Sequence, residues 1–212
     1  MTSVAPPVAD SKAAPRRGPR KLLRWLVLAA ALIAALSWVW SWYRYPSDRT
    51  PQGAYLRIVT AVNRGRPQDF FAYLETPAQH ACYSIRDYRK RARERVLASY
   101  PEPERTQLAA AYAEDAAAPD GADVFAAFAR RRGYMSRLRR DMSGIASVEQ
   151  RGERATVITG RGTRYPLRIR PENGIWGLTL FTAELVAEAE NAARDFALVD
   201  KAAADYERSK IR

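Results

Sequence analysis

Arginine side chains gather in two parts of this chain, and their guanidinium groups are suited to binding phosphate or carboxylate groups. The first group shares one face of an expected helix, and the second lies further along the chain. From the two groups we select six candidate contacts for an anionic partner: Arg86, Arg89, Lys90, Arg93, Arg130 and Arg137. Because aromatic residues that would stack on bases are not interleaved with them, we expect an anionic lipid or wall polymer rather than nucleic acid. A solvated face that is paired with acids such as Asp87 and Glu94 is the alternative.

Histidine and cysteine, which often serve in catalysis and zinc binding, occur once each, as His80 and Cys82. One of each cannot build a zinc site from several such ligands, and a single cysteine cannot form a disulfide within the chain. His80 lies off the apolar face of its expected helix, so we expect it at the surface and Cys82 in the core. The sequence has no serine-hydrolase, phosphate-loop, dinucleotide or zinc-protease motif. It therefore predicts no catalytic residues, no metal site and no cofactor.

One stretch, Trp25 to Tyr43, contains no charged residue and no proline. A helix over this stretch would measure roughly 28 Å, which is close to the ~30 Å hydrocarbon core of a bilayer. Aromatic residues crowd its ends, where amphipathic rings favour the headgroup region. We therefore expect a transmembrane helix over residues 22–45. Its expected anchoring side chains are Trp25, Trp38, Trp40, Trp42 and Tyr43.

The charges on the two sides of this stretch predict its orientation. Six cations precede it: Lys12, Arg16, Arg17, Arg20, Lys21 and Arg24. Fewer arginines, mixed with an acid, follow it, so we expect the N-terminus in the cytoplasm and residues 46–212 outside. Residues 1–21, which are rich in proline and basic residues, are expected to form a disordered cytoplasmic tail. A signal peptide that is cleaved after Ser37 is the alternative, although the apolar run continues beyond that site.

Residues 46–212 are long enough for one domain with its own core, and we expect an α+β domain. The whole chain carries a formal charge of +12, which favours anionic partners. Apolar residues recur at helical spacing up to Gly144 and alternate from Ile145 onward. We expect helices over residues 51–63, 67–74, 77–99, 104–113 and 122–140. We then expect strands over residues 145–150, 154–159, 163–170 and 175–181, and a final helix over residues 183–208.

The turns between these strands are too short for a crossover, so the strands are expected to form an antiparallel meander. Pro166 cannot donate a backbone hydrogen bond, which predicts that its strand lies at an edge or carries a bulge. In the last helix an apolar seam repeats at alternating spacings of four and three: Leu185, Ala189, Ala192, Phe196, Val199, Ala203 and Tyr206. We expect this seam to pack within the same domain, and a homodimer through residues 183–208 is the alternative.

Two segments carry a resemblance to a known family. TPQGAYLRIVTAVNRGRPQDFFAYL, residues 50–74, and SVEQRGERATVITGRGTRYPLRIRPENGIWGLTLF, residues 147–181, resemble the opening helix pair and the closing strands of the nuclear transport factor two-like superfamily. The resemblance implies a cystatin-like α+β cone, in which helices wrap against a curved antiparallel sheet. It also implies either an enzyme or a membrane-tethered extracytoplasmic module. Residues 77–143 and the helix after the last strand depart from the family pattern, and either could fill the mouth of the cone.

We expect a bacterial single-pass inner-membrane protein whose extracytoplasmic domain is a non-catalytic binding or assembly module of the cell envelope. Its expected partners are the lipid bilayer and envelope proteins or anionic polymers. One alternative is a domain that uses its cone as an enzyme or to bind a small ligand. Another is a membrane-attached nucleic-acid binder that uses the arginines. An open pocket lined by tyrosine and acidic side chains would favour the enzyme or small-ligand alternative. A pocket filled by Phe125, Phe128 or the last helix would argue against that alternative.

Overall fold

The computed structural model describes residues 19–44 and 46–211, with side chains described over residues 25–38, 40 and 46–210. The chain divides into two compact units, Met1–Arg44 and Tyr45–Arg212. Most of the predicted disordered tail, residues 1–18, lies outside the described residues.

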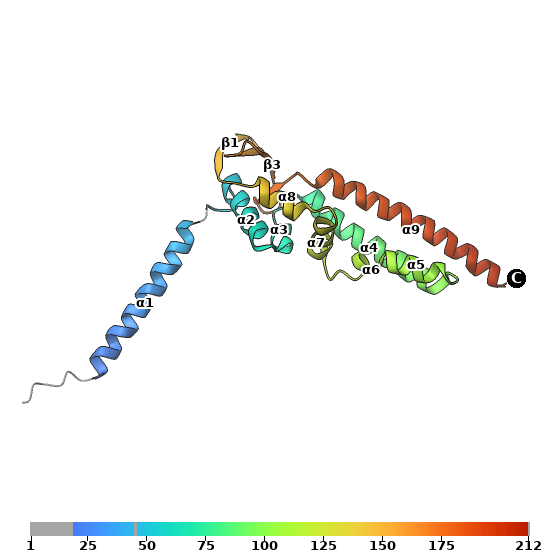
Figure 1. Cartoon of the computed structure of the whole chain (residues 1–212), viewed down its shortest axis with the longest axis horizontal. Helices are drawn as coiled ribbons and strands as arrows, with labels where there is room; N and C mark the ends of the chain where they lie inside the picture. Colours follow the sequence, from blue (N-terminus) through green and yellow to red (C-terminus); the bar gives the residue numbers. More distant parts are fainter. Residues whose placement is uncertain (1–18, 45, 212) are drawn as a thin grey trace, which may run out of the picture. The chain divides into compact units, whose positions relative to one another are not determined.

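The first unit contains helix α1, Pro19–Arg44 (Figure 1). This helix begins earlier than the predicted residue 22, because proline is favoured in the first turn, where a backbone N–H has no partner within the helix. Its described apolar side chains are widely exposed, with Leu32 63% and Ile33 64% exposed. Among the residues that the structure describes, no helix is both long enough and apolar enough to cross a membrane. The transmembrane helix therefore stays a prediction.

The second unit combines a helical region with a sheet and a long final helix (Figure 1). The helical region contains α2 Pro51–Arg64, α3 Pro67–Phe71, α4 Thr76–Ser99, α5 Glu104–Ala111, α6 Ala113–Ala116, α7 Gly121–Arg131 and α8 Tyr134–Asp141. The sheet contains β1 Ile145–Arg151, β2 Arg154–Thr159, β3 Arg164–Ile169 and β4 Trp176–Leu178, and α9 is Thr182–Ile211. The predicted α+β organisation and the four-stranded antiparallel meander are confirmed.

Local signals set the helix boundaries. The Thr50 hydroxyl accepts a hydrogen bond from the Gly53 N–H at 3.2 Å and caps the start of α2. The Asp120 carboxylate caps α7 in the same way. The predicted single helix over residues 122–140 is wrong. Gly133 adopts a φ of 66°, a left-handed conformation that ends one helix and separates α7 from α8.

Strand β3 pairs with β2 on one side and with β4 on the other, so it is not the edge strand that Pro166 predicted. The Pro166 carbonyl accepts a hydrogen bond from the Thr179 N–H at 3.1 Å, just beyond the end of β4. The N and C=O groups of one residue in an antiparallel strand face the same neighbour. The N–H that proline lacks therefore points to the side on which β4 has already ended.

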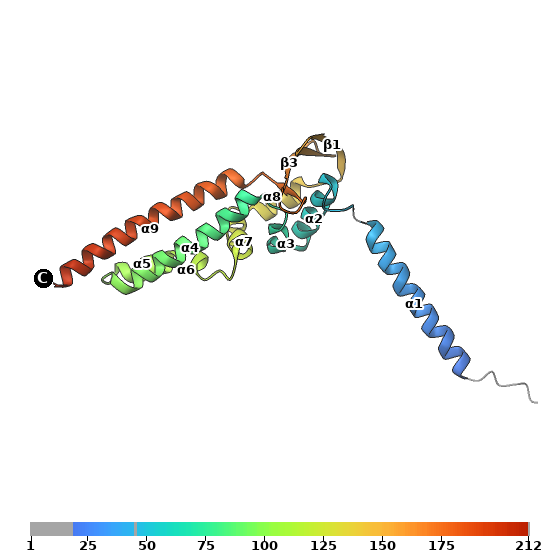
Figure 2. The same ribbon diagram turned by 180° about the vertical axis from the view of Figure 1, so that it is seen from behind.

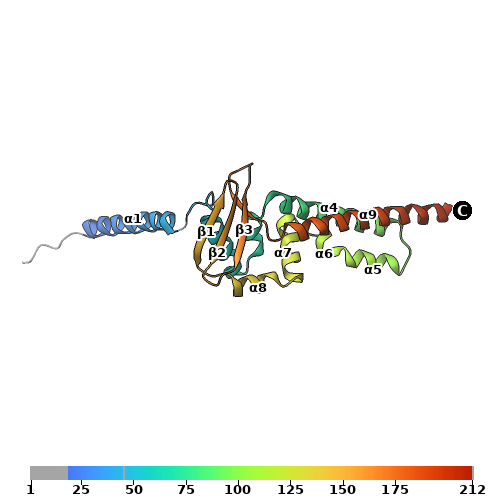
Figure 3. The same cartoon turned by 90° about the horizontal axis from the view of Figure 1, so that it is seen from above.

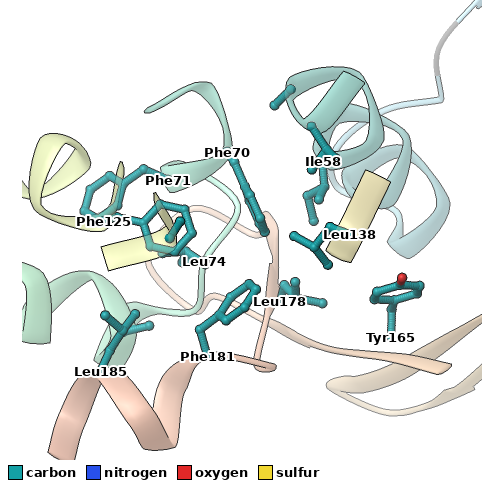
Figure 4. Packing of buried hydrophobic residues seen from close by; sticks show 14 of the residues in the cluster. Ile58, Phe70, Phe71, Leu74, Phe125, Leu138, Tyr165, Leu178, Phe181 and Leu185 are labelled. Atoms are coloured by element: carbon teal, nitrogen blue, oxygen red, sulfur yellow. The ribbon is translucent and has the colours of Figure 1, made fainter. Parts of the chain in front are cut away.

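Aromatic rings fill the space between the sheet and the helices (Figure 4). The Phe125 ring lies 5.3 Å from that of Phe70 and 5.8 Å from that of Phe181, measured between centroids. Phe125 and Phe128 are both buried, as are Leu74 and other residues of the same cluster. Burying each such side chain stabilises the fold by about 1.5–3 kcal/mol. The interior, where a cone would hold a ligand, is thus occupied by side chains.

Helices α4 and α9 pack along each other and form an arm that extends away from the sheet (Figures 2 and 3). The buried seam residues of α9 are Leu185, Ala192, Val199 and Ala203. The prediction that this helix packs within its own domain is confirmed, and its partner is α4. Ion pairs cross the same contact, with Arg89 Nη1 2.5 Å from Asp195 Oδ2 and Arg95 Nη1 2.6 Å from Glu207 Oε1.

Candidate functional site

A pocket of about 680 Å³ opens where the start of β2 and the end of β3 meet the start of α4. This volume falls within the usual range of small-molecule sites. Its arginine side chains are Arg154, Arg168 and Arg170, its acidic side chains are Glu75, Glu153 and Glu172, and His80 also lines it. We refer to it as the arginine pocket. Groups of both charges thus face one opening.

The register of the sheet places three arginines in a row that enters this pocket. Arg151 of β1 is directly opposite Arg154 of β2, and Arg154 is directly opposite Arg168 of β3. Directly opposed residues project from the same face of the sheet, and like charges in that arrangement destabilise it. Over the described residues, Arg154 has no ion-pair partner. The row therefore places three like charges next to one another, and Glu75, Glu153 and Glu172 are the acids that line the same pocket.

Glu75 is the buried acid of the arginine pocket, only 6% exposed, and it precedes the first turn of α4. Gly177 of β4, which is opposite Arg168, makes room for it, because a Cβ at Gly177 would lie 2.7 Å from the Glu75 Cα. Glu75 Oε2 lies 3.9 Å from Arg168 Nη1, too far for a hydrogen bond. In the part of the chain that the structure describes, this oxygen has no hydrogen-bond partner.

Arg170 and Glu172 border the pocket just after β3. Arg170 Nη1 donates to the Ala72 carbonyl at 2.9 Å, whereas its buried Nε–H has no hydrogen-bond partner among the described residues. The Thr76 hydroxyl donates to Glu172 Oε2 at 3.1 Å. A hydrogen bond from its own backbone N–H, the bond from Thr76 and nearby positive charge all lower the pKa of Glu172. This carboxylate is therefore ionised at neutral pH.

His80 is exposed at the rim of the arginine pocket, as predicted, and Cys82 is buried in the core, also as predicted. Burial, with a smaller contribution from the charge of Asp115, raises the pKa of the Cys82 thiol to about 12. Across the described ranges, no three or more His, Cys, Asp or Glu side chains are grouped so that they could hold a metal ion.

The predicted anion contacts on α4 are engaged to different degrees. Arg86 Nη2 lies 2.9 Å from Asp87 Oδ1. The Arg89 side chain is only 12% exposed, and it forms an ion pair with Asp195 of α9. Lys90 is exposed, and Arg93 is half-buried. Acids of the same unit therefore pair with part of this helix face, and Asp87 is one of the two acids that the alternative interpretation named.

The remaining two predicted contacts lie on α7 and α8. Arg130 Nη2 is 2.8 Å from Glu114 Oε1, and the Arg137 guanidinium carbon lies 5.3 Å from the centre of the Tyr134 ring. The predicted residues are thus distributed over three helices, and several already have acidic partners. For that reason we take the arginine pocket as the candidate site.

The predicted membrane-anchoring residues belong to α1. Trp25, Trp38 and Trp40 are 74%, 67% and 70% exposed. The side chains of Trp42 and Tyr43 lie outside the described residues.

Sequence reasoning missed Arg154 and Glu75 as site residues. One signal for Arg154 was present, because the tight turn at Gly152 sets Arg151 opposite Arg154. Glu75 carried no such signal, since its burial depends on the distant Gly177.

Comparisons of the chain with protein-family models, with curated proteins and with solved structures find no match. The resemblance to the nuclear transport factor two-like superfamily therefore stays a prediction.

Proposed function

We propose that this chain is a membrane-anchored, non-catalytic module of the bacterial cell envelope that binds an anionic group in the arginine pocket. The observation that carries the binding proposal is the row of directly opposed arginines: Arg151, Arg154 and Arg168. Such a row destabilises the sheet unless an anion offsets the repulsion. A bound oxyanion would do so through charge-assisted hydrogen bonds, which are the stronger class of hydrogen bond.

A neighbouring arginine supports this interpretation by contrast. Arg164 lies on the same face of β3, and its Nη2 is 2.7 Å from Glu149 Oε2 on β1. That pair offsets its charge within the sheet. Arg168 has only the longer contact of 3.9 Å with Glu75, and its side chain is 46% exposed. Among the described residues, Arg154 and Arg168 therefore lack a close ion pair like that of Arg164.

The non-catalytic part of the proposal rests on the surroundings of His80. A general base is normally oriented by a hydrogen bond and lies within reach of a nucleophile. Within the described part of the chain, the His80 side chain has no hydrogen-bond partner, and the nearby Thr76 hydroxyl donates to Glu172. We therefore propose binding rather than a reaction at this site.

The anchoring part of the proposal rests on the uncharged stretch Trp25 to Tyr43 and on the exposed apolar side chains of α1. Apolar surface of this extent favours apolar surroundings. The excess of cations before the stretch favours a cytoplasmic N-terminus and an extracytoplasmic second unit.

Calorimetric titration of the full-length chain in detergent with ethyl phosphate tests the binding proposal. We expect saturable binding that weakens as salt is added. Arg154→Gln and Arg168→Gln should each weaken it roughly tenfold or more, because a hydrogen bond to a charged group contributes about 1.5–3 kcal/mol. Arg164→Gln, on the same strand face but outside the pocket, is the matched control and should bind like the unmodified protein. Absence of saturable binding, or equal binding by all variants, would refute the proposal.

A further inference from the structure

We propose that the ligand of the arginine pocket is a zwitterion in which an ammonium group lies a few bonds from a phosphate group, as in phosphoethanolamine. This inference rests on the proposed anion binding and adds a second recognition element, Glu75. It specifies the chemical class of the ligand.

The need for a cationic group comes from Glu75. Its side chain is only 8% exposed, it lines the arginine pocket, and its Oε2 has no hydrogen-bond partner among the described residues. A buried carboxylate oxygen without a donor is costly, so its environment favours an incoming donor, above all a charged one. An ammonium group supplies up to three N–H donors on one atom.

The preference for phosphate over carboxylate comes from the number and arrangement of the cationic groups. Arg154, Arg168 and Arg170 all line the pocket, and the buried Nε–H of Arg170 has no hydrogen-bond partner in the described part of the chain. A carboxylate presents its two oxygens in one plane, whereas the oxygens of a tetrahedral phosphate point in several directions and suit several guanidinium groups at once.

The short separation of the two ligand charges follows from one distance. Arg168 Nη1 and Glu75 Oε2 are 3.9 Å apart, so the anionic and cationic subsites are adjacent. A ligand that engages both must carry its opposite charges only a few bonds apart. The adjacent subsites thus favour a ligand whose ammonium group is close to its phosphate.

Three matched probes separate the contributions of the ammonium and phosphate groups to the affinity of the full-length chain. They are phosphoethanolamine, ethyl phosphate, which lacks the ammonium group, and ethanolamine, which lacks the phosphate. We expect phosphoethanolamine to bind about tenfold or more tightly than ethyl phosphate, and ethanolamine to bind weakest. This comparison uses the unmodified protein, so it does not depend on whether a variant folds.

Glu75→Gln then tests the assignment to one residue. This nearly isosteric change should remove the advantage of phosphoethanolamine and leave the affinity for ethyl phosphate unchanged or higher. Glu149→Gln, an exposed acid on the sheet outside the pocket, is the matched control and should keep the full advantage.

The outcomes distinguish the two proposals. Equal affinity for phosphoethanolamine and ethyl phosphate would overturn the zwitterion and leave the anion site standing. An advantage that Glu75→Gln retains would also overturn it. Failure of both phosphates to bind would overturn the anion site as well.

A fourth probe identifies the source of the group. Glycerophosphoethanolamine carries the same ammonium and phosphate groups as a phosphodiester, as in a lipid headgroup, and is titrated into the full-length chain in detergent. Binding as tight as that of phosphoethanolamine, and lost in Arg154→Gln, would support a lipid headgroup, whereas binding of phosphoethanolamine alone would support a soluble ligand of the same class.

Discussion

Replacing Ala192 with leucine is expected to disturb the contact between α9 and α4. Ala192 is fully buried on α9, and α4 is the helix against which α9 packs. Glu188 and Asp195 lie one turn before and after it on the same face. Arg89 of α4 reaches both acids, with its Nη2 3.8 Å from Glu188 Oε1 and its Nη1 2.5 Å from Asp195 Oδ2. The small alanine side chain therefore lies where the Arg89 guanidinium spans two turns of α9.

The expected loss of stability follows from the complete burial of Ala192. Leucine adds three carbon atoms at a position with no exposed surface, and overpacking of this kind typically costs about 1–3 kcal/mol. For a unit of this size, each 1 kcal/mol lowers the unfolding temperature by about 2–4 °C. We therefore expect a decrease of roughly 2 to 12 °C.

Thermal and denaturant unfolding, followed by circular dichroism at 222 nm, measures the effect. Ala197→Leu is the matched control, because it makes the same substitution at an exposed position of α9 and should change stability by less than about 0.5 kcal/mol. If Ala192→Leu unfolds at the same temperature as Ala197→Leu, the close packing of α9 on α4 is refuted.

Further predictions concern the core. Phe125→Ala should lower the free energy of unfolding by about 3–5 kcal/mol in urea titrations, because it removes the ring at the centre of the aromatic cluster, and a loss below 1 kcal/mol would contradict that placement. The Cys82 thiol, with its pKa raised to about 12 by burial, should resist Ellman's reagent at pH 8 until the protein is unfolded; rapid reaction of the folded protein would contradict its burial. Burial likewise raises the pKa of Tyr165 from 10.0 to about 12. The fold therefore favours the neutral phenol, so its contribution to stability is complete below pH 10 and is lost as the pH rises toward 12. Urea unfolding at pH 8, 10 and 11 should show that the free energy of unfolding falls with pH in the unmodified protein and falls less in Tyr165→Phe. An equal fall in the two proteins would contradict this prediction.

Features that depend on neighbouring residues were predictable from the sequence. Thr50 and the proline after it mark the start of α2. The turns of the meander contain Gly152, Gly162 and Gly174, all of which adopt a positive φ that suits glycine. These signals act within a few residues, so the order of the elements and most of their boundaries follow from local chemistry.

Features that depend on distant residues were not predictable. The partner of Arg89 is 106 positions away at Asp195, so the sequence could not identify the acid that pairs with this arginine. The arginine pocket likewise requires the register that sets Arg154 opposite Arg168, and the close approach of Gly177 that buries Glu75. Periodicity indicates which residues share a face, but only the tertiary packing determines what covers that face.

The central claim, a module that an anchor holds outside the cytoplasm, is tested most directly by the sidedness of the second unit. In a Cys82→Ser background, Ala117→Cys places one thiol at an exposed position before α7, and Ser11→Cys places one in the N-terminal region instead. Intact and lysed bacterial cells are treated with a membrane-impermeant maleimide. The account predicts that the thiol at position 117 is labelled in intact cells and the thiol at position 11 only after lysis. Labelling of position 117 only after lysis would contradict the account.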